Sequence, residues 1–95
     1  MAPKIRIEIP KKLMGKKLGG EWVFLHLENG RYYGLNETGS LIWDEIRDKK
    51  DSEAAVDRLQ SAYHLERSQA EKDVRDLLKD LEKEGLIRIE RPEKT

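Results

Sequence analysis

Apolar and polar residues alternate at the start of the chain. Ile5, Ile7 and Ile9 are separated by charged residues and followed by Pro10. This period of two predicts a short, half-buried strand that the proline ends. The next stretch, 11–20, is rich in Lys and Gly and is expected to form a mobile loop.

Residues 21–27 are predicted to form a second strand that is apolar on both faces. Trp22 and Phe24 fall on one face, and three aliphatic residues fall on the other: Val23, Leu25 and Leu27. A central strand covered on both sides has this pattern, and so does a strand that keeps an aromatic patch exposed for a partner. The sequence leaves both possibilities open.

A hairpin is expected at Asn29-Gly30, because both central positions of a type I′ turn require positive φ. The third strand, 31–35, would complete an antiparallel meander and lie at the sheet edge. A two-residue loop also fixes a register, in which Leu27 faces Tyr32, His26 faces Tyr33, Leu25 faces Gly34 and Phe24 faces Leu35.

The remaining apolar residues follow helical spacing and predict three helices. Asn36 is expected to cap the first, which carries Leu41, Ile42, Trp43 and Ile46, and Ser52 to cap the second. The second helix would bury Ala55 or Val56 together with Leu59 and Tyr63.

The third helix is predicted to begin with a capping box made by Ser68 and Glu71. It is expected to end at Gly85, with Leu86 closing a Schellman motif on Leu81. Leu86–Ile89 would add a short extended segment. The buried stripe of this helix comprises Ala70, Val74, Leu77, Leu78 and Leu81, and Asp73, Asp76 and Asp80 line one edge of it.

Composition restricts the class of protein. Ninety-five residues predict one domain (1–95) with a modest core, and 40% of the residues are charged with a net charge of zero. Zero net charge argues against a dedicated nucleic-acid binder. Residues 1–20 carry six basic side chains against one acidic, about +5, and are expected to be a partly flexible arm that either touches an acidic partner or is simply solvated. Residues 90–95 are expected to be a flexible tail.

Candidate catalytic chemistry is sparse. Cysteine is absent, and the two histidines, His26 and His64, are far apart and lack metal-ligand spacing. No serine has a plausible base nearby, so neither an active site, a metal site nor a cofactor is expected. The chain also lacks a signal peptide or an apolar stretch long enough to cross a membrane, which predicts a cytoplasmic protein.

The run GRYYGLNETGSLIW, preceded by WVFLHL and followed by DVRDLLKDLEKEGLI, resembles the PqqD family. Its members are small domains that bind the leaders of ribosomally made, post-translationally modified peptides. The resemblance covers 21–89 and is strongest to the stand-alone members of lasso-peptide pathways. It implies an α+β, winged-helix-like fold, with a three-stranded antiparallel sheet followed by three helices.

The resemblance also implies a binding mode and partners. A precursor leader peptide would pair with the third strand and rest on the third helix. Separate enzymes, a leader peptidase and a cyclase or another modifying enzyme, would act on it. An edge strand suits this role because its unpaired backbone groups can accept another strand. The candidate peptide-binding residues are Arg31, Tyr32, Tyr33, Gly34, Leu35, Asp73, Val74, Asp76, Leu77, Asp80 and Leu81.

Two other functions remain as alternatives. A winged-helix nucleic-acid binder would use the third helix for recognition, but the basic and acidic residues of that helix are balanced. A dimerising adaptor would use the face that carries Trp22 and Phe24. Gel-shift and sedimentation experiments, respectively, test these alternatives.

Overall fold

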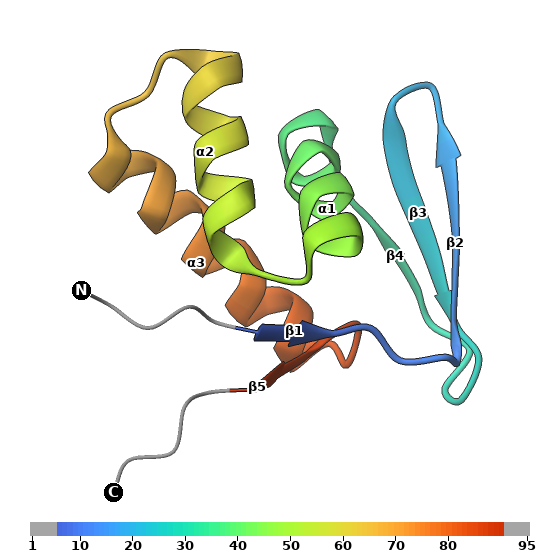
Figure 1. The fold of residues 1–95 in the computed structure, drawn as a ribbon. Coiled ribbons are helices and arrows are strands. Elements are labelled where there is room, and N and C mark those ends of the chain that lie inside the picture. The colour runs from blue at the N-terminus through green and yellow to red at the C-terminus, as the bar shows by residue number, and fades with distance from the viewer. Residues whose placement is uncertain (1–5, 91–95) are drawn as a thin grey trace, which may run out of the picture.

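The computed structural model describes residues 6–90, and its three helices lie on one face of a three-stranded antiparallel sheet (Figure 1). The predicted α+β class, with a three-stranded sheet followed by three helices, is confirmed. The elements in chain order are β1 (Arg6–Glu8), β2 (Leu13–Leu18), β3 (Glu21–His26), β4 (Tyr32–Gly34), α1 (Glu37–Lys49), α2 (Ser52–Tyr63), α3 (Arg67–Lys83) and β5 (Arg88–Glu90).

The first strand of the sheet is not the predicted one. The Lys- and Gly-rich stretch expected to be a loop forms β2, which pairs with β3 along six residues. Gly19 and Gly20, both with positive φ, make the turn between them. Gly15 is needed inside the strand because a Cβ there would lie 2.9 Å from the ring of Phe24. The glycines that suggested flexibility therefore serve a turn and a packing contact.

The predicted first strand exists as β1, but it pairs with β5 in a separate two-stranded sheet. Both strands read Arg-Ile-Glu, so antiparallel pairing places each arginine opposite a glutamate and Ile7 opposite Ile89. The two isoleucines are buried in the core. The flexible arm predicted over 1–20 thus contains two strands. Ile5 and most of the predicted tail lie outside the described residues, although Glu90 belongs to β5.

The predicted type I′ hairpin between β3 and β4 is wrong. The loop has four residues, 27–30, because the Gly30 amide donates to the His26 carbonyl at 2.8 Å and the His26 amide donates to the Arg31 carbonyl. Gly30 has φ +70°, and Asn29 instead accepts a hydrogen bond from the Arg31 amide. Phe24 consequently faces Tyr33, two positions from the predicted register. A shift of two keeps every side chain on its expected face.

The aromatic face of the sheet packs against α1. The rings of Phe24 and Trp43 meet edge to face, with centroids 4.5 Å apart, and Trp22 stacks on Phe24. Phe24 is buried and Trp22 half-buried, so this face is core and not a free surface for a dimer. The opposite face of the sheet is open and displays Met14, Leu18 and Tyr32.

The helix ends agree only partly with prediction. Asn36 caps α1, accepting from the Gly39 amide at 2.8 Å. Asp51, not Ser52, caps α2, because its carboxylate already reaches the Ala54 amide. The predicted capping box at Ser68 is wrong, because α3 already begins at Arg67 and no side chain caps it. The guanidinium of Arg67 pairs with Glu53 and Asp57 of α2.

The predicted C-terminal motif of α3 is present. Gly85 has φ +79°, and the Leu86 amide donates to the Leu81 carbonyl at 2.9 Å. The chain then reverses direction and enters β5, which begins two residues later and ends one residue later than the expected extended segment.

Candidate functional site

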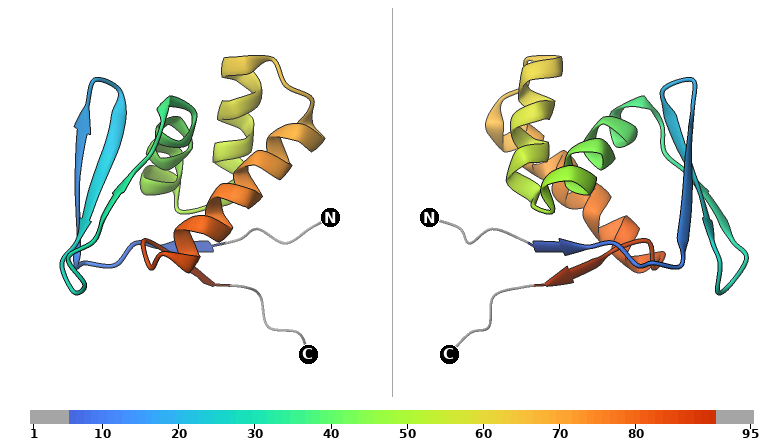
Figure 2. Two further views of the ribbon diagram at one scale, coloured as in Figure 1. Left: turned by 180° about the vertical axis from the view of Figure 1, so that it is seen from behind. Right: turned by 45° about the vertical axis from the view of Figure 1, so that its right-hand side comes forward.

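The candidate site begins at β4, an edge strand of the main sheet. The strand order is β2-β3-β4, so β4 pairs with β3 on one side, and no other strand of residues 6–90 pairs with it. The left view of Figure 2 shows β4 running beside the β2–β3 hairpin before the chain enters α1. The predicted edge position is confirmed.

The hydrogen bonds show which backbone groups of β4 point outward. The amide of His26 donates to the Arg31 carbonyl, and the amide of Leu35 donates to the Trp22 carbonyl. Hydrogen-bonded and non-hydrogen-bonded pairs alternate along an antiparallel ladder. Residues 31, 33 and 35 therefore face β3, while the N–H and C=O groups of Tyr32 and Gly34 face the open edge.

The side chains around this edge leave it accessible. Tyr32 lies on the open face of the sheet with 75% of its surface exposed. At Gly34 nothing lies within 4 Å of the position a Cβ would occupy. The Tyr33 side chain is half-buried on the helix side, and Leu35 belongs to the core.

Tyr33 faces the C-terminal half of α3. Burial raises the pKa of its phenol, and the negative charges of Asp80 and Glu84 raise it further. The spacing of Leu77, Asp80 and Glu84 places them on one side of the helix. We call these three residues the α3 flank; one end of it is tied to the hairpin by the ion pair of Arg31 with Glu84.

The other predicted residues of α3 divide into two groups. Val74 and Leu81 are buried and belong to the core, whereas Asp73 is half-buried and accepts a hydrogen bond from Gln69. Asp73 lies one turn before Leu77 and continues the line of the flank. Asp76 is exposed and points away from the core stripe, where Lys72 donates to its carboxylate and lowers its pKa.

Glu84 was not among the residues proposed from sequence. It continues the four-residue spacing from Asp80 and immediately precedes Gly85, so its helical position was readable. Its pairing with Arg31 depends on how the hairpin folds back onto α3, which the sequence does not reveal.

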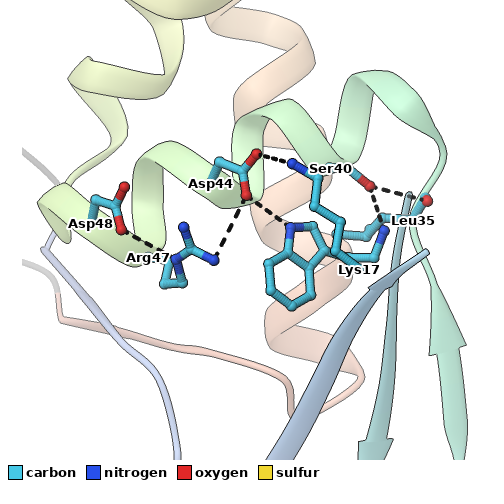
Figure 3. Close-up of polar contacts among 7 residues, drawn as sticks. Lys17, Leu35, Ser40, Asp44, Arg47 and Asp48 are labelled. Carbon is cyan, nitrogen blue, oxygen red and sulfur yellow. Dashed lines mark hydrogen bonds and ion pairs between the residues drawn. The ribbon is translucent and has the colours of Figure 1, made fainter. Parts of the chain in front are cut away.

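Polar side chains of α1 contact β2 and β3, the two strands of the sheet beyond β4 (Figure 3). Asp44 accepts hydrogen bonds from the Trp22 indole and from the Lys17 ammonium, both at 2.8 Å. Burial alone would raise the pKa of Asp44, but these donors and the nearby Arg47 outweigh it and lower the pKa. Arg47 also lies over the Trp22 ring, 5.2 Å from its centroid.

Residues 6–90 contain neither a metal-binding cluster nor a membrane-spanning helix. No three acidic or histidine side chains gather in a way that could hold a metal ion. Within the same range, none of the helices has the length and apolar character needed to cross a membrane.

The sequence model of the family described as coenzyme PQQ synthesis protein D (PqqD) matches residues 21–87. The chain belongs to the PqqD family. This match confirms the resemblance inferred from the central motif and the third helix. No curated protein matches this PqqD-family chain by sequence comparison.

Two solved structures share the fold. One is described as TbiB1 in complex with the TbiA(beta) leader peptide; it is 32% identical, with a TM-score of 0.80 over 92% of this chain and 99% of that one. The other is a lasso peptide synthetase B1 complexed with the leader peptide, 25% identical, with a TM-score of 0.80 over 87% and 98%. Both relatives were thus solved with a leader peptide bound.

Proposed function

We propose that this PqqD-family domain binds the leader of a ribosomally synthesised precursor peptide by strand addition to β4. The observation that carries the proposal is the open edge, where the backbone groups of Tyr32 and Gly34 point away from β3. An extended peptide would satisfy these groups with main-chain hydrogen bonds. The two leader-bound relatives support the same ligand class.

Side chains of the added strand would alternate between two surroundings. Those directed toward the helices would meet Tyr33 and the α3 flank, where Leu77 offers apolar contact and Asp80 and Glu84 offer negative charge. Those directed the other way would lie beside Tyr32 on the open face. The α3 flank, with Asp73, would therefore select the leader, while Val74, Leu81 and Leu35 support it from the core.

The role in the pathway is that of a non-catalytic adaptor. The domain would hold the leader while separate enzymes, a leader peptidase and a macrolactam-forming cyclase of the lasso type, act on the precursor. Adaptors of this kind raise the local concentration of substrate at an enzyme.

The test is a titration of the purified domain with a synthetic leader from a precursor encoded beside it. Binding should protect the amides of Tyr32 and Gly34 from hydrogen exchange while leaving Tyr33 unchanged, because the Tyr33 amide is already bonded within the sheet. Incubation with full precursor should leave the mass of the precursor unchanged. Absence of binding, or protection confined to another surface, would refute strand addition here, and cleavage or cyclisation would refute the adaptor role.

A further inference from the structure

The ladder between β3 and β4 is interrupted at its last pair, Trp22 and Leu35. In a regular hydrogen-bonded pair, the two residues exchange both N–H···O bonds. Here the Leu35 amide donates to the Trp22 carbonyl at 2.8 Å, but the Trp22 amide donates to the Ser40 hydroxyl, also at 2.8 Å. That hydroxyl donates onward to the Leu35 carbonyl at 3.2 Å. The side chain of Ser40 thus replaces one rung of the ladder (Figure 3).

Ser40 is well placed to hold this arrangement. It lies in the first turn of α1, where its own amide donates to the Asn36 carbonyl. Among residues 6–90 it is the one polar residue that is buried, with 1% of its surface exposed. Its hydroxyl both donates and accepts a hydrogen bond. A buried hydroxyl satisfied in this way is held in a single position. One side chain therefore joins α1 to both strands where β4 ends.

We propose that Ser40 is a positioning residue for the binding edge; this inference rests on the proposed function. By separating the last pair of the ladder, the hydroxyl sets the distance between the ends of β3 and β4. Gly34 immediately precedes Leu35 and carries the last outward N–H and C=O of the edge. Ser40 thereby fixes the direction in which these two groups meet an incoming strand.

Loss of the hydroxyl has a defined consequence. In Ser40→Ala the Trp22 amide and the Leu35 carbonyl lose their shared partner, and closing the ladder directly is the way to satisfy both. That closure draws Leu35 toward β3 and turns Gly34 with it. We expect leader affinity to fall at least tenfold while the helical circular-dichroism signal is retained.

The experiment compares Ser40→Ala with two matched variants. Ser40→Cys keeps the shape of the side chain but is a weak donor and acceptor, so it should lose affinity as Ser40→Ala does. Val56 lies on α2, away from the edge, and its replacement by Ala lowers the free energy of unfolding without changing the ladder. The Val56→Ala variant should therefore bind the leader with an affinity within about twofold of wild type. Amide chemical shifts of Gly34 in the leader-free proteins should move in both Ser40 variants and stay fixed in Val56→Ala.

Each outcome decides the question. Wild-type affinity in Ser40→Cys, or an unmoved Gly34 amide in both Ser40 variants, overturns the positioning role. An affinity loss in Val56→Ala equal to that of the Ser40 variants assigns the effect to stability and also overturns it. If wild type itself fails to bind leader, the proposed function falls, and the Gly34 shift still decides whether Ser40 sets the edge. Should Ser40→Ala not fold, the Ser40→Cys measurements carry the test alone.

Discussion

Arg31 and Glu84 form an ion pair that joins the start of the edge strand to the C-terminal end of α3, with 3.3 Å between guanidinium nitrogen and carboxylate oxygen. The arginine side chain is 70% exposed, so the pair contributes at most about 1 kcal/mol to stability. The pair lies beside Tyr33, whose phenol faces the negative charges of Asp80 and Glu84. The open edge strand and the α3 flank are thus in contact at one end through Arg31 and Glu84.

Proline substitution separates the outward from the inward backbone groups of β4. Tyr32→Pro and Gly34→Pro each remove an N–H that points away from β3, so they should abolish leader binding with little change in the thermal midpoint. Tyr33→Pro removes an N–H bonded to β3 and should destabilise the fold by about 3 kcal/mol.

Calorimetric titration and thermal unfolding of the three variants provide the test. Tyr33→Pro also serves as the control for a general effect of proline in this strand. Wild-type affinity in both Tyr32→Pro and Gly34→Pro would rule out strand addition at β4.

Charge on the line formed by Asp73 and Asp80 should contribute to affinity for a leader that places a Lys or Arg against it. Asp73→Asn or Asp80→Asn should each weaken binding by about 0.5–2 kcal/mol, since a partly desolvated pair is worth more than an exposed one. Asp76→Asn is the matched control, because Asp76 is exposed and bound to Lys72.

The measurement is leader affinity at two salt concentrations, repeated with a leader whose basic residue is replaced by Gln. The effect of Asp73→Asn and Asp80→Asn should shrink at high salt and vanish with the neutral leader. Equal losses from all three variants would show that net charge, not position, is responsible.

Ionisation of Tyr33 reports its position against α3. Its pKa is raised above 10.0 by burial and by Asp80 and Glu84, so the neutral phenol is favoured in the folded protein. The stability linked to this shift is full below the unfolded value of 10.0 and is lost as pH rises through the folded pKa. In NMR titrations of the Tyr33 ring, Asp80→Asn and Glu84→Gln should both lower its pKa. An unchanged titration in both would place Tyr33 away from the flank.

The contacts of Asp44 predict a stability change with the opposite pH dependence. Its pKa is lowered from 3.8 by Lys17 and Trp22 against the effect of burial, so the stabilisation is present above 3.8 and is lost as pH falls through the folded pKa. Asp44→Asn should cost about 1 kcal/mol at neutral pH and progressively less in acid. Asp48→Asn, in an exposed pair with Arg47, should cost less at neutral pH. Urea unfolding across the pH range measures both, and a constant difference for Asp44→Asn would contradict the assignment.

The helices and the edge strand could be predicted because their signals are local. Asn36 caps α1 through a side chain three residues from its donor, and Gly85 ends α3 through its own positive φ. The sheet partners were harder because they depend on distant residues. Gly15, for example, predicts a loop from its local sequence, but the structure places it in a strand against the ring of Phe24.

The candidate site shows the same division. Tyr32, Tyr33 and Gly34 were found from their pattern, and the shift of two residues in register leaves the backbone groups of Tyr32 and Gly34 pointing outward, as the predicted register also would. Glu84 and Ser40 were missed. Each acts through a partner far along the chain, Arg31 for Glu84 and Trp22 for Ser40, and no short-range pattern encodes such a pairing.

The pairing of β1 with β5 places Arg6 directly opposite Glu90, so the two ends of the described chain meet side by side. A linker of a few residues could join them into a ring, and new ends could then be opened at the exposed turn of Gly19 and Gly20. Such a circular permutant would keep β4 and α3 intact. Its new termini would lie at the tip of the β2–β3 hairpin. An enzyme or reporter could then be fused to the domain there instead of at β1 or β5.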